Sequence, residues 1–138
     1  MIQRIQSLWL LGASVLASLN FLFPFYSGTK IINGLSSPAE LDGGSTLFTV
    51  VLSAVLLVLG IIAIFLYKDR KRQLGCSIGG VILGIILVVV YFLEIKNFET
   101  GSIALWCVFA MGIPVFYFFA ARGIWKDQKL VKSLDKLR

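Results

Sequence analysis

Four long apolar runs constrain this chain more than any other feature of its sequence. They cover residues 8–26, 47–67, 75–93 and 103–121, and none of them contains Asp, Glu, Lys, Arg or His. Each run holds about twenty residues, which as an α-helix is roughly 30 Å long, the thickness of a bilayer's hydrocarbon core. We therefore predict an all-α membrane protein, with an antiparallel bundle of four transmembrane helices over residues 1–121. A short amphipathic cytoplasmic helix is predicted for residues 122–138.

The positive charges lie almost entirely on one side of this predicted membrane domain. Eleven of the 13 Lys and Arg residues are in the N-terminal segment, in residues 68–74 or in the tail, which alternating spans place on the same side. The other side has only Lys30 and Lys96, beside four carboxylates. Because basic residues near span ends are retained in the cytoplasm, we expect both termini to be cytoplasmic.

The three basic segments together form a predicted contact surface. Basic residues next to a span attract the anionic lipids of the inner leaflet, and they also suit an acidic surface on a partner protein. The tail, read as an amphipathic helix, either lies on this leaflet or docks on a cytoplasmic partner, and the two readings are compatible. The residues predicted to contact headgroups or a partner are Arg4, Lys68, Arg70, Lys71, Arg72, Arg122, Lys126, Lys129 and Lys132.

Small residues mark one face of the third run. Cys76, Gly80 and Gly84 recur every four residues, and Gly79 belongs to a second such pair beside them. Because small residues let helix backbones approach closely in a membrane, we predict that Cys76, Gly79, Gly80 and Gly84 pack against another helix. The alternative is a slot for a lipid or for the tail of a cofactor.

The segment between the first two runs, residues 27–46, is rich in glycine. Within it, Asn33 and Gly34 stand between short apolar stretches, a pattern that predicts a β-hairpin with a two-residue type I′ turn.

Reactive residues are scarce. The sequence has no His, no Cys-x-x-Cys motif and no carboxylate inside an apolar run. We therefore expect no metal site, no cofactor and no enzymatic activity. Ion-coupled transporters place an ionisable residue within the membrane, and none is present in the runs. The net charge of +6 gathers at span ends, so we expect membrane lipids as partners and no nucleic acid.

A polar path through the membrane would have few residues to use. The only candidates are Asn20, Ser14, Ser18, Cys107 and Tyr117, which are spread along the depth of the predicted domain.

Three stretches carry a resemblance to a known family: residues 1–11, residues 67–73 and residues 121–138, which includes the segment Arg-Gly-Ile-Trp-Lys-Asp-Gln-Lys. They resemble a family of small four-span inner-membrane proteins of unknown function from the Bacteroidota. The resemblance covers nearly the whole chain and implies a bacterial inner-membrane location, a helical membrane domain and no assigned activity or catalytic residue.

The functional prediction follows mainly from these exclusions. We expect a non-enzymatic accessory or scaffolding subunit of a larger membrane complex, in contact with other membrane-protein subunits. The alternative is a small transporter or a lipid-binding or lipid-handling membrane protein.

Overall fold

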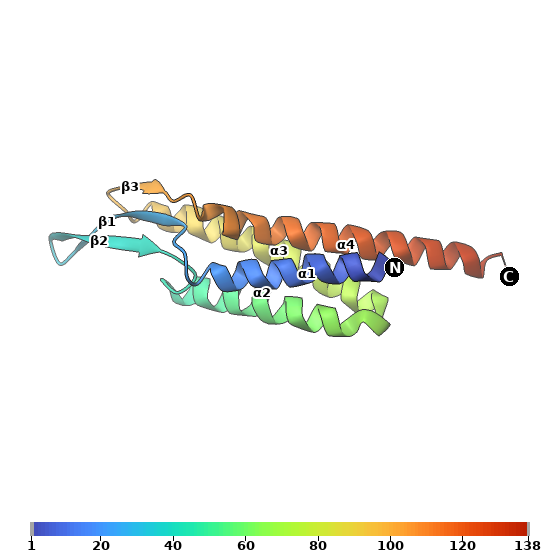
Figure 1. The fold of residues 1–138 in the computed structure, drawn as a ribbon. Coiled ribbons are helices and arrows are strands. Elements are labelled where there is room, and N and C mark those ends of the chain that lie inside the picture. The colour runs from blue at the N-terminus through green and yellow to red at the C-terminus, as the bar shows by residue number, and fades with distance from the viewer. Residues whose placement is uncertain (1, 138) are drawn as a thin grey trace.

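The computed structural model describes residues 2–137, with side chains from residue 5 onward. Within that range the chain forms four α-helices that lie side by side, and a small β-sheet at one end of them (Figure 1). The strands are β1 (Tyr26–Ile32), β2 (Leu35–Leu41) and β3 (Thr100–Ile103). The helices are α1 (Ile2–Leu19), α2 (Leu47–Phe65), α3 (Arg70–Ile95) and α4 (Cys107–Asp135), with a 3₁₀ turn, η1 (Leu66–Lys68), after α2.

Among the described helices, three are long and apolar enough to cross a membrane: the segment Leu47–Lys68, α3 and α4. The apolar part of α1 is shorter and covers Ile5–Leu19. The prediction that the first run stays helical to residue 26 is wrong, because α1 ends at Leu19. Pro24 accounts for the difference, since it has no amide hydrogen and pushes the preceding residue toward extended backbone.

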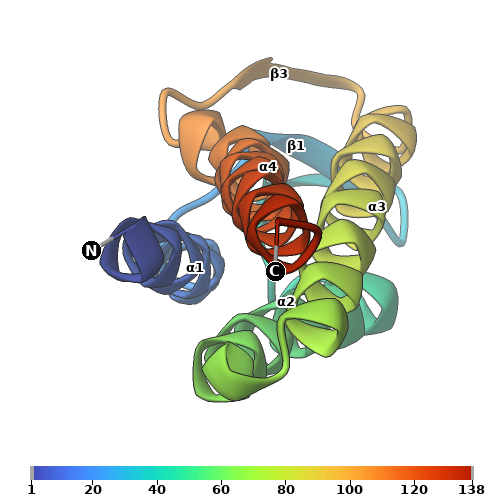
Figure 2. The same ribbon diagram turned by 90° about the vertical axis from the view of Figure 1, so that its right-hand side faces the viewer.

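The helices pack in a ring. The main contacts of α1 are with α2 and α4, and those of α3 are also with α2 and α4 (Figure 2). Each helix contributes an apolar side chain that is completely buried between the others: Leu10, Leu56, Leu87 and Ile113. Large apolar side chains, among them Val58 and Ile82, also cover the outside of the ring. So extensive an apolar exterior suits hydrocarbon rather than water.

The sheet corrects the prediction of an all-α fold. Its strand order is β2-β1-β3, and both pairs are antiparallel. The hairpin predicted at Asn33 and Gly34 is confirmed: Ile32 pairs with Leu35, and the two turn residues have φ of 55° and 80°. Positive φ at both central positions is what a type I′ turn requires. The strand β3 was not predicted, and its last residue, Ile103, was assigned to the fourth span.

Aromatic packing fixes the sheet to the helices. Phe25, just before β1, stacks on Tyr91 of α3 with ring centroids 4.6 Å apart. The carbonyl of Phe25 accepts a hydrogen bond of 3.0 Å from the amide of Ala104, which follows β3. The sheet therefore closes one end of the helices, which we call the sheet end.

The predicted C-terminal helix is present but is not a separate element. α4 continues without a break from Cys107 to Asp135, a length of 29 residues. That corresponds to roughly 43 Å, well beyond the hydrocarbon thickness of about 30 Å. The last buried residue of α4 is Asp127, and the final turns extend past the ends of the other helices (Figure 1). The tail therefore projects along the axis of α4, and does not fold back as an independent surface helix.

Candidate functional site

The basic residues gather at the end of the molecule opposite the sheet, which we call the charged end. It consists of residues 68–72, which run from the 3₁₀ turn η1 into the first turn of α3, and of the chain from Arg122 onward (Figure 1). Asp69 organises the first of these segments. Its carboxylate accepts a 3.3 Å hydrogen bond from the backbone N–H of Arg72, capping α3, and forms an ion pair of 3.0 Å with the Arg72 guanidinium. Among the described residues, Asp69 thus neutralises Arg72 rather than its other basic neighbours.

A basic pocket lies between this segment and α4. Its volume is about 500 Å³. One residue in it stands out: the side-chain Nε2 of Gln128 is buried and has no hydrogen-bond partner among the described residues. A buried N–H without an acceptor is costly, so this group is suited to receive an anionic oxygen. The lining residues are Lys68, Asp69, Arg70, Lys71, Gln128, Val131 and Lys132.

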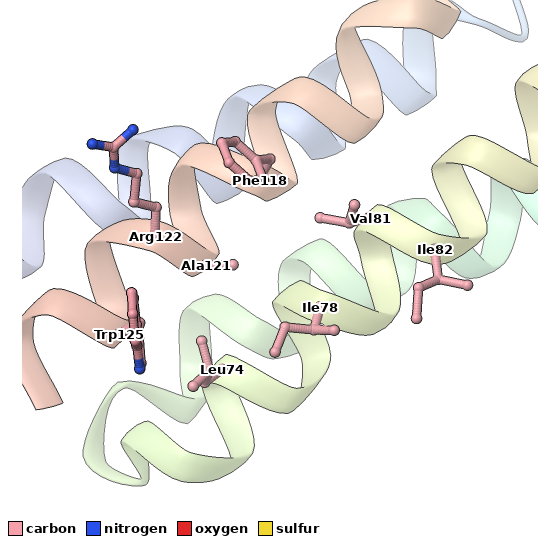
Figure 3. A pocket seen from close by; sticks show the side chains of 8 residues that line it. All are labelled: Leu74, Ile78, Val81, Ile82, Phe118, Ala121, Arg122 and Trp125. Atoms are coloured by element: carbon pink, nitrogen blue, oxygen red, sulfur yellow. The ribbon is translucent and has the colours of Figure 1, made fainter.

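An apolar groove of about 700 Å³ lies between α3 and α4 (Figure 3). Trp125 extends from α4 beside Leu74 of α3, whereas the guanidinium of Arg122 points away from α3. Apart from Arg122, the side chains in the groove carry no charge. They are Leu74, Ile78, Val81 and Ile82 from α3, and Phe118, Ala121, Arg122 and Trp125 from α4.

The groove and the basic pocket follow one another along the same seam. On α4, Phe118, Trp125 and Lys132 are seven residues apart, a spacing that keeps them on one face of a helix. On α3, Lys71, Leu74 and Ile78 are separated by three and four residues, and they also share a face. The basic pocket therefore follows the apolar groove along the seam, toward the charged end.

The predicted basic surface divides into parts with different surroundings. Lys68, Arg70, Lys71 and Lys132 line the basic pocket, and Arg122 borders the apolar groove. Arg72 is paired with Asp69. Lys126 and Lys129 are exposed and line neither cavity. The side chain of Arg4 lies outside the described residues.

The small-residue face of α3 is also divided. A Cβ atom on Gly80 would collide with the ring of Tyr117, and one on Gly84 would lie 3.1 Å from Pro114. Cys76 is half-buried and packs against the core. Gly79 is different, because a Cβ atom there would meet no neighbouring atom within 4 Å. The close contact with α4 therefore runs along Gly80 and Gly84, and Gly79 is not part of it.

The polar residues considered for a path through the membrane do not converge on either cavity. Asn20, the residue after α1, donates hydrogen bonds to Ser53 of α2, at 3.0 Å, and to Tyr91 of α3, at 2.6 Å. The hydroxyl of Tyr117 donates to the carbonyl of Leu56. Ser14 and Ser18 donate to carbonyls of α1 itself. These groups hold helices together, and Cys107 also lines neither cavity.

Sequence reasoning missed Gln128, the most informative residue of the basic pocket. An isolated Gln in a charged tail resembles any solvated side chain. Because the tail was predicted as a helix separate from the fourth span, the face of α4 on which Gln128 lies was not predicted. Continuing the helical periodicity from Trp125 would have placed it toward α3. The residues that the structure describes contain no group of three or more His, Cys, Asp or Glu side chains that could hold a metal ion.

Comparison with known proteins gives one match. The family described as a domain of unknown function (DUF4293) matches residues 2–137. No curated protein and no solved structure matches the chain. Because the match covers nearly all of its length, the chain belongs to this family of unknown function.

Proposed function

We propose that this protein is a non-enzymatic accessory or scaffolding subunit of a larger complex in a bacterial inner membrane, with its charged end and both termini in the cytoplasm. The observation that carries the proposal is the extension of α4 beyond the other helices, with an uncovered apolar face. A helix end without tertiary contacts is only marginally stable in water, and most helical stability comes from packing of an amphipathic face. A bound partner would supply that packing.

The uncovered face is formed by leucines on the side of α4 that points away from the basic pocket. Leu130 and Leu134 are 48% and 65% exposed. Leu130 follows Gln128 by two residues, which on a helix is a turn of about 200°, so the two side chains point in nearly opposite directions. The face consists of Leu130, Leu134 and Leu137, and we call it the leucine face.

Charge complementarity identifies the kind of partner. Lys126 and Lys129 lie on α4 at one edge of the leucine face and are exposed. A second copy of this chain would bring like charges together, which disfavours self-association through this surface. A cytoplasmic segment of another membrane subunit, with an apolar stripe and flanking carboxylates, fits both features, since amphipathic helices commonly dock by such stripes.

The orientation follows from the distribution of charge. The N-terminal segment, residues 68–74 and the tail from residue 122 together hold eleven of the 13 basic residues, and basic segments next to spans favour the cytoplasmic side. An inner-membrane location would put the leucine face in the compartment where cytoplasmic subunits are available.

The alternative functions differ in how well they are supported. A small transporter needs a wet polar path, and the hydrogen bonds of Asn20 and Tyr117 within the ring disfavour one. Lipid binding is favoured by a specific observation, an apolar groove followed along the same seam by a basic pocket.

The test compares what co-purifies with the full chain after mild detergent extraction at native expression. We expect one acidic membrane-associated companion at fixed stoichiometry, lost when Leu130→Asp and Leu134→Asp are combined and weakened by high salt. The control combines Ile31→Asp and Ile32→Asp, two exposed apolar residues at the sheet end. Recovery of the wild type as a free monomer in several detergents and in nanodiscs would contradict the proposal. The same companion on the wild type and the leucine-face variant would do so as well.

A further inference from the structure

We propose that the seam between α3 and α4 binds one anionic phospholipid, with an acyl chain in the apolar groove and the phosphate in the basic pocket. This inference is independent of the proposed scaffolding function, because the residues involved lie on the opposite side of α4 from the leucine face.

The apolar groove fits a hydrocarbon chain. Its volume of about 700 Å³ is in the range of sites that hold small apolar ligands. The groove opens on the outside of helices long and apolar enough to cross a membrane, where lipid tails are the surrounding solvent. Trp125 stands at the charged end of the groove, the position that indole rings favour at a membrane interface.

The basic pocket fits a phosphate. Lys68, Arg70, Lys71 and Lys132 bring four positive charges to it, against the single carboxylate of Asp69. That carboxylate is already paired with Arg72, so it does not neutralise the pocket. Lysine and arginine are the usual ligands of phosphate oxygens, and arginine binds them with two parallel N–H groups.

Gln128 supplies a second, independent indication of an anionic ligand. Its Nε2 is buried in the pocket wall with no acceptor among the described residues. A phosphate oxygen would satisfy this donor, which an ammonium or an apolar group would not. The pocket lining therefore includes both basic side chains and an amide N–H without an acceptor among the described residues, and both kinds of group bind phosphate oxygens.

The order of the two cavities selects a lipid over a free anion. Lys71 precedes Ile78 by seven residues, so the basic pocket lies roughly 10 Å along α3 from the middle of the apolar groove. A phospholipid has the same arrangement, with charge at the interface and hydrocarbon directly below it. A free phosphate would use the pocket alone and leave the groove without a role.

Native mass spectrometry of the full chain in detergent provides the test, with short-chain phosphatidylglycerol and phosphatidylcholine of identical acyl length titrated separately. We expect one phosphatidylglycerol per chain, bound on the order of tenfold or more tightly than phosphatidylcholine. Combining Lys71→Gln with Lys132→Gln should remove most of this preference. The matched control, Lys126→Gln with Lys129→Gln, removes the same charge from exposed positions outside both cavities and should preserve it.

A second pair of variants tests the groove separately from the charges. Ile78→Trp fills the groove and should weaken binding of both lipids, whereas Val58→Trp, on the exterior of α2, should not. Circular dichroism and a monodisperse elution profile establish that each variant is folded. Because the lysine variants alter the basic pocket and Ile78→Trp alters the groove, the two experiments test the two cavities separately.

Three results would overturn the inference. Equal affinity for the two lipids would contradict the selection of an anionic headgroup, because phosphatidylcholine carries the same phosphate with a compensating choline charge. An equal loss from both lysine pairs would indicate a diffuse basic surface. Competition by inorganic phosphate at the same concentration as lipid, with no effect of Ile78→Trp, would identify a site for free anions instead.

Discussion

The side-chain amide of Gln6 donates a hydrogen bond of 2.5 Å to the carboxylate of Asp127, and both side chains are buried. The two residues are 121 positions apart and join the first turns of α1 to the last buried turn of α4. Without this bond the buried carboxylate of Asp127 would lose the hydrogen bond that Gln6 donates to it. The contact thus fixes the point at which α4 leaves the ring of helices.

Gln6→Leu should destabilise the protein more than Asp127→Asn, which replaces the charged acceptor by a neutral amide. The Gln6→Leu variant leaves a buried charge unpaired, which costs about 2–3 kcal/mol. Asp127→Asn keeps an oxygen that accepts from Gln6 and should cost less. Thermal unfolding in detergent measures the difference, and Asp135→Asn, at an exposed position, is the control. Equal loss from both buried variants would show that the charge of Asp127 has no effect on stability.

Gly80→Leu should destabilise the contact between α3 and α4 by a few kcal/mol, because the new side chain would displace the ring of Tyr117. Gly79→Leu is the matched control, next in sequence but with open space where its Cβ would lie. Both variants would be compared by thermal unfolding in the same detergent. If Gly80→Leu resists heating as well as the wild type does, the contact is looser than described.

The polar cluster around Asn20 gives a graded prediction. Asn20→Ala removes the donor to both Ser53 and Tyr91 and should cost about 2–3 kcal/mol, since two buried hydroxyls lose a partner. Tyr91→Phe removes one acceptor and should cost about 1 kcal/mol. Ser18→Ala, at an exposed position of α1, serves as the control. Equal unfolding temperatures for all three variants would refute a structural role for the cluster.

The close pairing of β1 with β3 depends on two glycines that face each other, Gly28 and Gly101. A Cβ atom on Gly101 would lie 2.6 Å from the Cα of Gly28 and equally close to the carbonyl oxygen of Ser27. Gly101→Val should therefore separate β3 from β1 and raise amide hydrogen exchange in both strands. Ser102→Val, one residue further along β3, is the control. Unchanged protection in Gly101→Val would mean that the strands tolerate a wider spacing.

The sequence patterns predicted most of the helices and failed where the chain changes environment. Apolar runs mark where a helix can lie in hydrocarbon, so α2 and α3 were placed correctly to within a few residues. The prediction that the helix of the fourth span ends at Ala121, before a separate C-terminal helix, was wrong. A change from apolar to charged residues marks where a chain leaves the membrane, yet no proline interrupts α4 there and the helix continues.

The β-structure was predictable only where a local signal exists. Asn33 and Gly34 specify their turn by themselves, whereas β3 has four exposed residues and no alternation of buried and exposed side chains. Its existence depends on pairing with β1, some 70 residues away in sequence. Gln128 likewise shows its role only through residues brought beside it from the start of α3 and the turn before it.

Accessibility of single cysteines in intact cells tests the account most directly, because the docking of a partner and the binding of an inner-leaflet lipid both require the charged end in the cytoplasm. Ser133→Cys would probe the end of α4, and Ser36→Cys the hairpin, each in a background with Cys76→Ala and Cys107→Ala. A membrane-impermeant maleimide should label position 36 in intact inner-membrane spheroplasts, and position 133 only after the membrane is opened. Labelling of position 133 from outside, with protection of position 36, would contradict the account.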